Sequence, residues 1–249
     1  MDSLTVYPKR QNTKQKVAQE KWWIHWNTRT EMRQALSKLT RYVATPRVGK
    51  HRIFVWLDKS VLPDTTLVVF AREDDYFFGV LHSKLHEIWA RRKGTQLRDA
   101  ESGFRYTHTT AFETFPMPFL PSNEPSGKEN PFVAEIADAA RRLVNFRDAW
   151  MSPKGLGEYV SAKHLTLVNL YNALEIYRHE FKGKQRNARL WEAEVKGVTL
   201  GEIEELDTIH SELDRAVLSA YGWPRSLNDE QISVRPLKLN AERVTSYAD

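Results

Sequence analysis

A stretch rich in proline and glycine, LPSNEPSGKENP at residues 120–131, divides this chain and constrains its fold more than any other feature. Four of its residues interrupt helical or strand periodicity, namely Pro121, Pro125, Gly127 and Pro131. With 249 residues and 41% hydrophobic positions, the chain can bury a core as one large domain or two small ones. We predict two modules, residues 1–120 and 132–249, joined by a linker at 121–131.

The first module has the pattern of a mixed α/β domain. Short apolar runs at Arg52–Leu57 and Thr66–Phe70 predict two strands separated by an LPDT turn. A helix is predicted at Thr30–Leu39, and a second, amphipathic helix at Asp75–Arg91 ends near Gly94. The apolar face of the second helix has spacings of three and four and consists of Phe78, Leu81, Leu85, Ile88 and Trp89.

The second module has helical periodicity. Apolar residues recur at helical spacing in three segments, residues 131–150, Leu165–Tyr177 and Ile203–Tyr221. The polar stretch Pro224–Asp249 is expected to be a loosely ordered tail. The predicted fold class is α+β, a mixed α/β domain followed by a C-terminal helical bundle.

Charge is distributed unevenly between the two halves. Residues 1–120 contain 20 Lys and Arg against 12 Asp and Glu, whereas residues 121–249 contain 17 against 20. A basic module of this kind is typical of polyanion binding, because each neutralised phosphate releases condensed counterions. A merely solvated basic surface fits the charge equally well.

The absence of cysteine excludes disulfides and thiolate metal sites and is compatible with a reducing compartment. The N-terminal segment contains Lys and Arg, its only apolar cluster is WWIHW, and no apolar run reaches 18 residues. We therefore expect a cytoplasmic chain with no signal peptide, no membrane span and no membrane partner.

No recognisable catalytic motif is present. An S-adenosylmethionine-dependent DNA methyltransferase needs an Asn/Asp-Pro-Pro-aromatic motif, and the chain has no Pro-Pro pair. The only tight glycine cluster, Lys154–Gly157, follows a helix and not a strand, which weakens a phosphate-binding interpretation. The nuclease-like pieces Pro63-Asp64 and Glu194–Lys196 lie in different modules.

Two histidines could share one helical face. His82 and His86 are four residues apart, which suits zinc, but no Glu follows His82 directly and no third ligand is evident. We favour a structural or phosphate-contacting role for both. Ser83 lies beside them without a nucleophile elbow, so hydrolase chemistry has no support.

Nucleic-acid binding fits the first module better. A basic segment precedes the first predicted strand, with Gly49 expected to allow an unusual backbone angle, and a second basic cluster ends the amphipathic helix. Arginine and glutamine are side chains that read guanine and adenine, respectively. The candidate DNA-binding residues are Arg47, Lys50, His51, Arg52, Arg91, Arg92, Lys93, Gln96, Arg98 and Arg105.

Several motifs in a fixed order also carry a family resemblance. They are Ala44–Arg52, Asp74–Tyr76, Phe78–Ser83, His86–Trp89, Phe112–Pro116, Leu165–Asn172, Leu213–Val217 and Ala220–Trp223. The first five resemble the target-recognition domain of single-chain type IIG/IIL restriction-modification enzymes and related adenine-specific DNA methyltransferases. The last three resemble the C-terminal helical region of the same enzymes.

The resemblance implies a division of labour. In the family, an upstream domain binds S-adenosylmethionine and methylates an adenine amine, while the region like this chain selects the sequence of double-stranded DNA. We therefore expect this chain to bind no cofactor and to have no catalytic activity alone. Its implied partner is a methyltransferase domain or subunit that binds S-adenosylmethionine.

Within that scheme, Arg47, Lys50 and Arg52 are expected to contact the DNA backbone or bases. The cluster at residues 91–93 would anchor phosphates. Gln96, Arg98 and Arg105 would lie nearest to base readout. Two alternatives stay open: a protein-interaction module whose acidic half docks a separate methyltransferase, and an intact enzyme with strongly diverged motifs.

Overall fold

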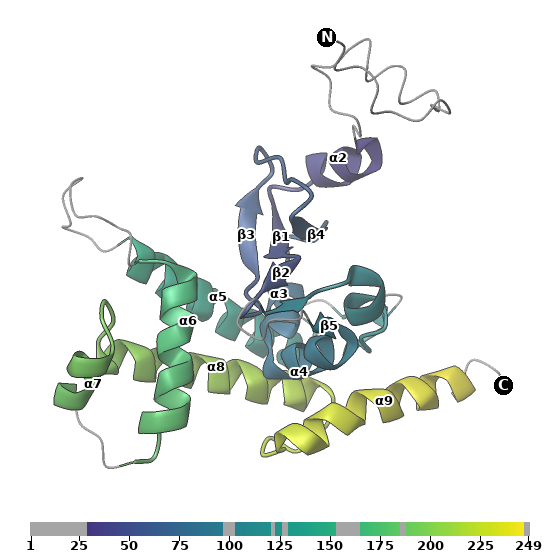
Figure 1. The fold of residues 1–249 in the computed structure, drawn as a ribbon. Coiled ribbons are helices and arrows are strands. Elements are labelled where there is room, and N and C mark those ends of the chain that lie inside the picture. Colours follow the sequence, from purple (N-terminus) through teal and green to yellow (C-terminus); the bar gives the residue numbers. More distant parts are fainter. Residues whose placement is uncertain are drawn as a thin grey trace, which may run out of the picture.

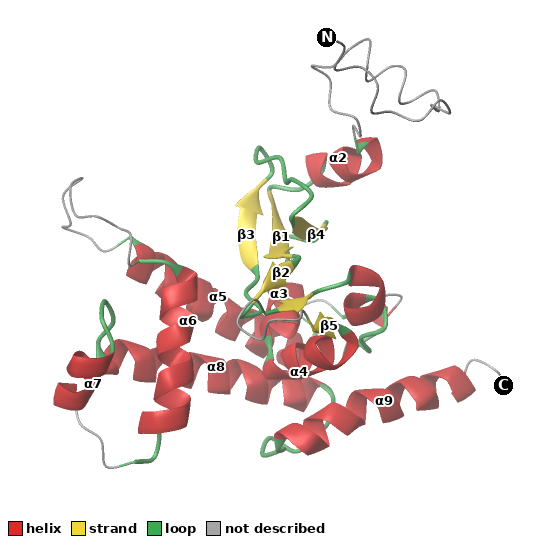
Figure 2. Ribbon diagram, in the orientation of Figure 1, coloured by secondary structure: helices red, strands yellow, loops and turns green. Residues whose placement is uncertain are grey.

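Helices dominate the part of the chain that the structure describes, and the two small antiparallel sheets found there lie in its N-terminal half (Figure 2). The computed structural model describes residues 29–96, 103–120, 123–125, 129–152, 165–184 and 188–246. The α+β class predicted from the sequence is confirmed. The position of the linker at 121–131 stays a prediction.

The first sheet has the strand order β3-β1-β4, with β1 at Arg41–Pro46, β3 at Val55–Asp58 and β4 at Leu67–Phe70. Val43 in the central strand lies opposite both Trp56 and Phe70. The predicted strands correspond to β3 and β4, whereas β1 was not predicted. The short helix α2, Thr30–Ser37, precedes this sheet and agrees with the predicted helix.

The second sheet has the order β2-β6-β5, formed by Val48–Gly49, Phe104–Arg105 and Thr95–Gln96. Its strands are only two residues long. β5 pairs with the next strand, β6, but β2 pairs with β6 across a long stretch of sequence, which local composition does not indicate.

The predicted helix at Asp75–Arg91 is two helices, α3 at Asp75–His82 and α4 at Lys84–Lys93. Ser83 breaks them apart because its backbone is extended, with φ −72° and ψ 152°. Its hydroxyl donates to the Val80 carbonyl at 2.7 Å and also accepts from the first turn of α4. Serine is a favoured N-cap, so Ser83 encodes the break between the helices. A single serine within an apolar helical pattern, however, is a weak indication that a helix ends.

The C-terminal half contains α5 at Pro131–Met151, α6 at Leu167–Ile176, α7 at Ala188–Glu194 and α8 at Leu200–Ala220. Capping residues define where the long helices begin. Asn130 caps α5, and Thr199 with Glu202 forms a capping box at α8. In Figure 1, α5 and α8 run beneath the first sheet, with α6 and α7 at one side.

The C-terminal residues form helix α9, Asp229–Ser246, so the prediction of a loosely ordered tail after residue 224 is wrong. Asn228 and Gln231 cap its start reciprocally, each backbone N–H donating to the other's side-chain oxygen at 3.0 and 2.9 Å. Ile232 is buried in the main core. Tertiary contacts therefore order a stretch whose composition is polar.

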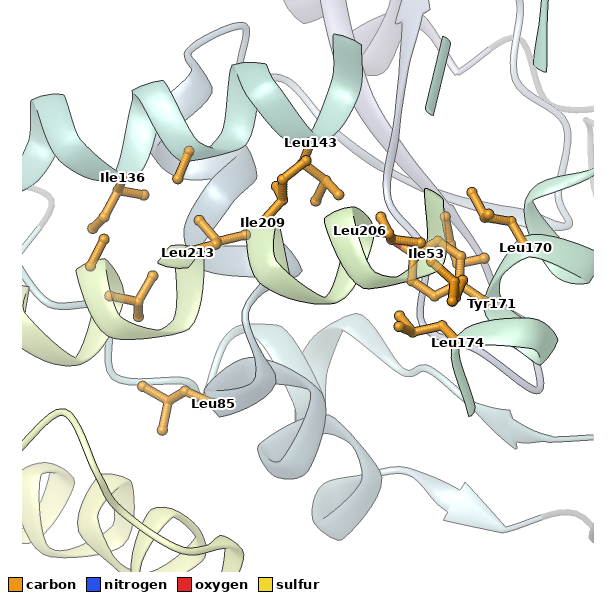
Figure 3. Packing of buried hydrophobic residues seen from close by; sticks show 14 of the residues in the cluster. Ile53, Leu85, Ile136, Leu143, Leu170, Tyr171, Leu174, Leu206, Ile209 and Leu213 are labelled. Atoms are coloured by element: carbon orange, nitrogen blue, oxygen red, sulfur yellow. The ribbon is translucent and has the colours of Figure 1, made fainter. Parts of the chain in front are cut away.

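The main apolar core crosses the boundary between the two predicted modules. Ile53 and Leu85 from the first module belong to the same buried cluster as residues of α5, α6 and α8. Figure 3 shows them together with Leu143, Leu170 and Leu206. Among the described residues, no helix is both long and apolar enough to cross a membrane.

Candidate nucleic-acid interface

The basic segment at residues 47–52 begins at Arg47, whose backbone is fixed between the two sheets. Its N–H donates to the Thr66 carbonyl and its carbonyl accepts from the N–H of Tyr106, both at 2.7 Å. The Nε of Arg47 donates to the Thr65 carbonyl at 2.6 Å. No carboxylate among the described residues is paired with this guanidinium, which is therefore a candidate for contact with an anion.

Lys50 and His51 lie against helix α6. The Lys50 ammonium donates to Asn172 Oδ1 at 3.0 Å and pairs with Glu175 at 2.8 Å. His51 Nε2 lies 2.8 Å from the same Asn172 oxygen. These two predicted DNA-binding residues are therefore engaged within the protein.

Arg52 is buried, with 5% of its surface exposed. Its guanidinium donates to the Thr45 hydroxyl at 3.0 Å and to the Pro46 carbonyl, and it lies over the Phe104 ring. Burial lowers the pKa of Arg52 to about 10. The structure places this residue inside the fold, where it links the two sheets, so the expected direct contact between Arg52 and DNA finds no support.

The cluster at the end of α4 is only partly free. Arg91 donates to Glu87 at 2.8 Å and to the Lys50 carbonyl at 3.1 Å. Arg92 donates to the Ser233 carbonyl of α9 at 3.1 Å. Lys93 is exposed, and its ammonium lies 5.0 Å from the centroid of Trp89. The helix dipole favours cations in the last turn of a helix, so these three residues also stabilise α4.

Arg105 is exposed on β6, the central strand of the second sheet. It lies opposite Val48 on one side and Thr95 on the other. Directly opposed residues share one face of a sheet, so Arg105 and the 39% exposed Val48 form an outward surface. Gln96 pairs with Phe104 through its backbone, and Arg98 lies outside the described residues.

The glycine that needs an unusual backbone angle is Gly103 and not Gly49. Gly103 has φ 82°, and a Cβ there would lie 2.2 Å from the Gly49 carbonyl oxygen. The unusual backbone angle expected at Gly49 is not found, because Gly49 has no positive φ. Close approach of β2 to the start of β6 explains why glycine is required at residue 103.

His82 and His86 are buried and hydrogen-bonded. His86 Nδ1 lies 2.8 Å from the Leu81 carbonyl, so it carries the proton, and Nε2 accepts from the Tyr106 hydroxyl at 3.0 Å. His82 Nε2 accepts from the Arg147 guanidinium at 2.6 Å, because arginine can only donate. The structural role favoured from the sequence agrees with this burial, whereas a phosphate contact does not.

Metal and nuclease chemistry gain no support from the described residues. They contain no group of three His, Cys, Asp or Glu side chains that could hold a metal ion. Asp64, the acid of the nuclease-like pair, accepts from the N–H of Thr66 at 2.8 Å. Hydrogen bonds from Thr66 lower the pKa of this carboxyl, whose role is to close a turn.

Residues 6–119 match the family described as the target recognition domain of MmeI. The resemblance to type IIL restriction-modification enzymes is confirmed. The MmeI-like segment includes the first sheet, the second sheet and helices α2 to α4.

The fold likeness extends beyond that segment. A structure of the type IIL restriction-modification enzyme MmeI in complex with DNA matches 95% of this chain with a TM-score of 0.62 and 17% identity. The match spans 25% of that enzyme's chain, so this chain corresponds to a quarter of its length. At this identity the likeness shows a shared fold, which includes the helical half. No curated protein gives a match.

Sequence reasoning missed the residues that hold the MmeI-like segment against the helices. Asn172 binds Lys50 and His51, and the Asp214 carboxylate accepts from the N–H of Lys84 at 2.7 Å. Both belong to motifs that were noted only for their family resemblance. The sequence held no local signal for either residue, because Thr166 and Asn169 in the first motif and Arg215 in the second are also polar.

Proposed function

We propose that this chain selects a DNA sequence as the specificity portion of a type IIG/IIL-like restriction-modification adenine DNA methyltransferase. The match of residues 6–119 to the MmeI target recognition domain carries this proposal. The MmeI structure with the same fold was determined in complex with DNA, which supports double-stranded DNA as the partner. The net positive charge of residues 1–120 is consistent with phosphate contacts.

The proposed DNA-facing surface is built around the second sheet. Arg105 lies on its central strand β6 and Gln96 on the edge strand β5, whereas Arg98 lies outside the described residues and is included on its residue type alone. We assign these three to base readout, because Arg and Gln side chains can make paired hydrogen bonds to purine edges. Arg47 and Lys93 are assigned to phosphates.

Catalysis is assigned to another domain or subunit. That partner would bind S-adenosylmethionine and methylate adenine, and the target base would have to be flipped out of the duplex into its pocket. We assign no catalytic residue to this chain and propose that it is cytoplasmic. Its contribution is to hold the duplex in the correct register.

A second candidate, a module that docks a methyltransferase without reading DNA, is favoured by one feature of the helical half. A groove of about 930 Å³ between α5 and α8 has Phe146, Trp150 and Ile209 among its lining residues. Glu202 and Glu205 also line it. Stable binding of a purified methyltransferase subunit by a chain that binds no DNA would favour this candidate.

The test of sequence selection is binding of the purified chain to a randomised duplex library at moderate salt, followed by sequencing of the retained DNA. We expect one motif to be enriched, with affinity for it falling steeply as salt rises. Retention of DNA without an enriched motif would reduce the function to nonspecific binding. Absence of retention would contradict DNA recognition by this chain alone.

A further inference from the structure

The motif Leu165–Asn172 ends with a side chain that reaches from the helical half to the basic segment 47–52. Asn172 lies on α6, whose neighbouring Tyr171 and Leu174 are buried in the main core. The helix is therefore a rigid support at this point. Its polar residue faces the MmeI-like segment instead of completing the core.

The chemistry of the two partners defines the role of the amide. Lysine can only donate hydrogen bonds, so the Asn172 atom 3.0 Å from the Lys50 ammonium is an oxygen. The same oxygen lies 2.8 Å from His51 Nε2, which must then carry a proton and donate. One acceptor thus fixes two consecutive residues, and one of these hydrogen bonds is charge-assisted.

These two residues follow β2 directly. The other end of β2 is held by Arg47, whose backbone bonds Thr66 and Tyr106. Val48 and Gly49 pair with Arg105 and Phe104 on β6. A two-residue strand has few bonds of its own, so its position depends on the anchors at its two ends.

We propose that Asn172 is a positioning residue for DNA recognition: by fixing Lys50 and His51 it sets the position of β2, and hence of the sheet that carries Arg105. Asn172 itself contacts no DNA in this scheme. The inference rests on the proposed function, because it assigns sequence readout to that sheet. It gives the helical half a part in specificity beyond packing.

A second residue of α6, Glu175, also contacts Lys50, but it holds this segment less firmly than Asn172. Glu175 pairs with Lys50 at 2.8 Å, but both side chains are 46% exposed. Exposed ion pairs contribute little to stability, because water and salt screen them. The bonds to Asn172 also engage His51, whose ring lies 6.0 Å from that of the buried Tyr171.

The test compares Asn172→Leu, which removes the acceptor, with Asn172→Asp, which keeps it. We expect Asn172→Leu to lower the affinity ratio between the preferred duplex and a scrambled duplex about tenfold, as loss of a charge-assisted bond would. Asn172→Asp should restore that ratio to near the unsubstituted value. Glu175→Gln and Val168→Ala are matched controls on the same helix, Val168 being 54% exposed, and should change the ratio less than twofold.

Amide hydrogen exchange supplies a measurement that needs no DNA. Faster exchange at residues 48–52 in Asn172→Leu, but not in Asn172→Asp, would support the positioning role. Unchanged exchange, or equal loss of affinity for preferred and scrambled duplexes, would overturn it. If the unsubstituted chain selects no sequence, the proposed function fails. The exchange rates of residues 48–52 in Asn172→Leu then decide separately whether Asn172 fixes this segment.

Discussion

At the scale of single residues, buried imidazoles make this fold sensitive to acid. Burial lowers the pKa of His86 to about 3 and holds the pKa values of His82 and His210 well below the ordinary value. A histidine that is neutral in the folded state binds its proton only on unfolding. Stability from these groups is therefore complete above about pH 6.5 and is lost as pH falls below that value.

Asp214 acts in the opposite direction, because burial raises the pKa of its carboxyl to about 6. This group favours the folded state below about pH 4, and its contribution is lost as pH rises through 6. On acidification, the stability lost through the three histidines exceeds the stability gained through the one carboxyl. We therefore expect net loss of stability on acidification from pH 7 to pH 5.

The residue to test is His86. The variant His86→Gln should be less stable than the unsubstituted chain at pH 7, because it disturbs the bonds to Leu81 and Tyr106. Between pH 7 and pH 5, however, it should lose about 2 kcal/mol less stability, since one proton uptake is removed. Urea denaturation at both pH values measures this difference. Equal losses in the two proteins would show that His86 is not a neutral buried group.

The sequence shows which residues are basic, but it does not show which of them are buried or paired within the protein. The sequence distinguishes neither Arg52 from Arg47 nor Lys50 from Lys93, because all are basic residues in polar or mixed segments. Their burial and pairing differ because of contacts with residues far away in the sequence. Arg52 reaches Phe104, and Lys50 reaches α6. Local composition carries no information on such distances.

At the scale of elements, helices α3 and α5 meet at a glycine. A Cβ placed on Gly79 would lie 2.7 Å from Ile136 Cγ2 and 3.2 Å from Ala140 Cβ. Helix α3 belongs to the MmeI-like segment and α5 to the helical half, so this contact sets the distance between them. An added methyl group must displace Ile136 or separate the helices.

We expect Gly79→Ala to destabilise the protein by about 1–3 kcal/mol through overpacking, despite the better helix propensity of alanine. Gly201→Ala on α8 is the control, because its added Cβ would meet no atom within 4 Å apart from its chain neighbours and its own helix backbone. That variant should be neutral or up to about 0.5 kcal/mol more stable. Thermal or urea unfolding of both variants provides the comparison. A neutral Gly79→Ala variant would contradict close packing of α3 on α5.

Elements with a strong local pattern were predictable and elements made by tertiary contacts were not. Helices α5 and α8 follow an apolar period over 21 residues each, and both were predicted. Strand β1 was missed although Tyr42, Val43 and Ala44 are buried, because this apolar run is only three residues long and Pro46 follows it closely. The two-residue strands have no period at all.

At the scale of the whole molecule, the two predicted modules share one core. Val80, Leu85, Trp89 and Phe115 lie in the same apolar cluster as Leu143 and other residues of the helical half. The hydrophobic effect acts on this whole surface, so separation would expose it to water. The stability of the MmeI-like segment therefore depends on the helices.

A chain ending at residue 120 tests this dependence. It should lack a cooperative unfolding transition and should expose Trp89 to quenchers, because the helices that cover its apolar face are absent. The full chain should unfold in one transition. Cooperative unfolding of the shortened chain, with Trp89 protected, would show that the segment folds independently.

Sequence selection by the second sheet is the central claim, and one paired selection tests it most directly. The full chain and its Arg105→Ala variant would be presented with the same randomised duplex library, and the retained DNA sequenced. We predict one enriched motif for the full chain and a motif degenerate at one position for the variant, since a paired arginine contact discriminates by about 1–3 kcal/mol. No motif for the full chain, or an identical motif for both proteins, would contradict the account.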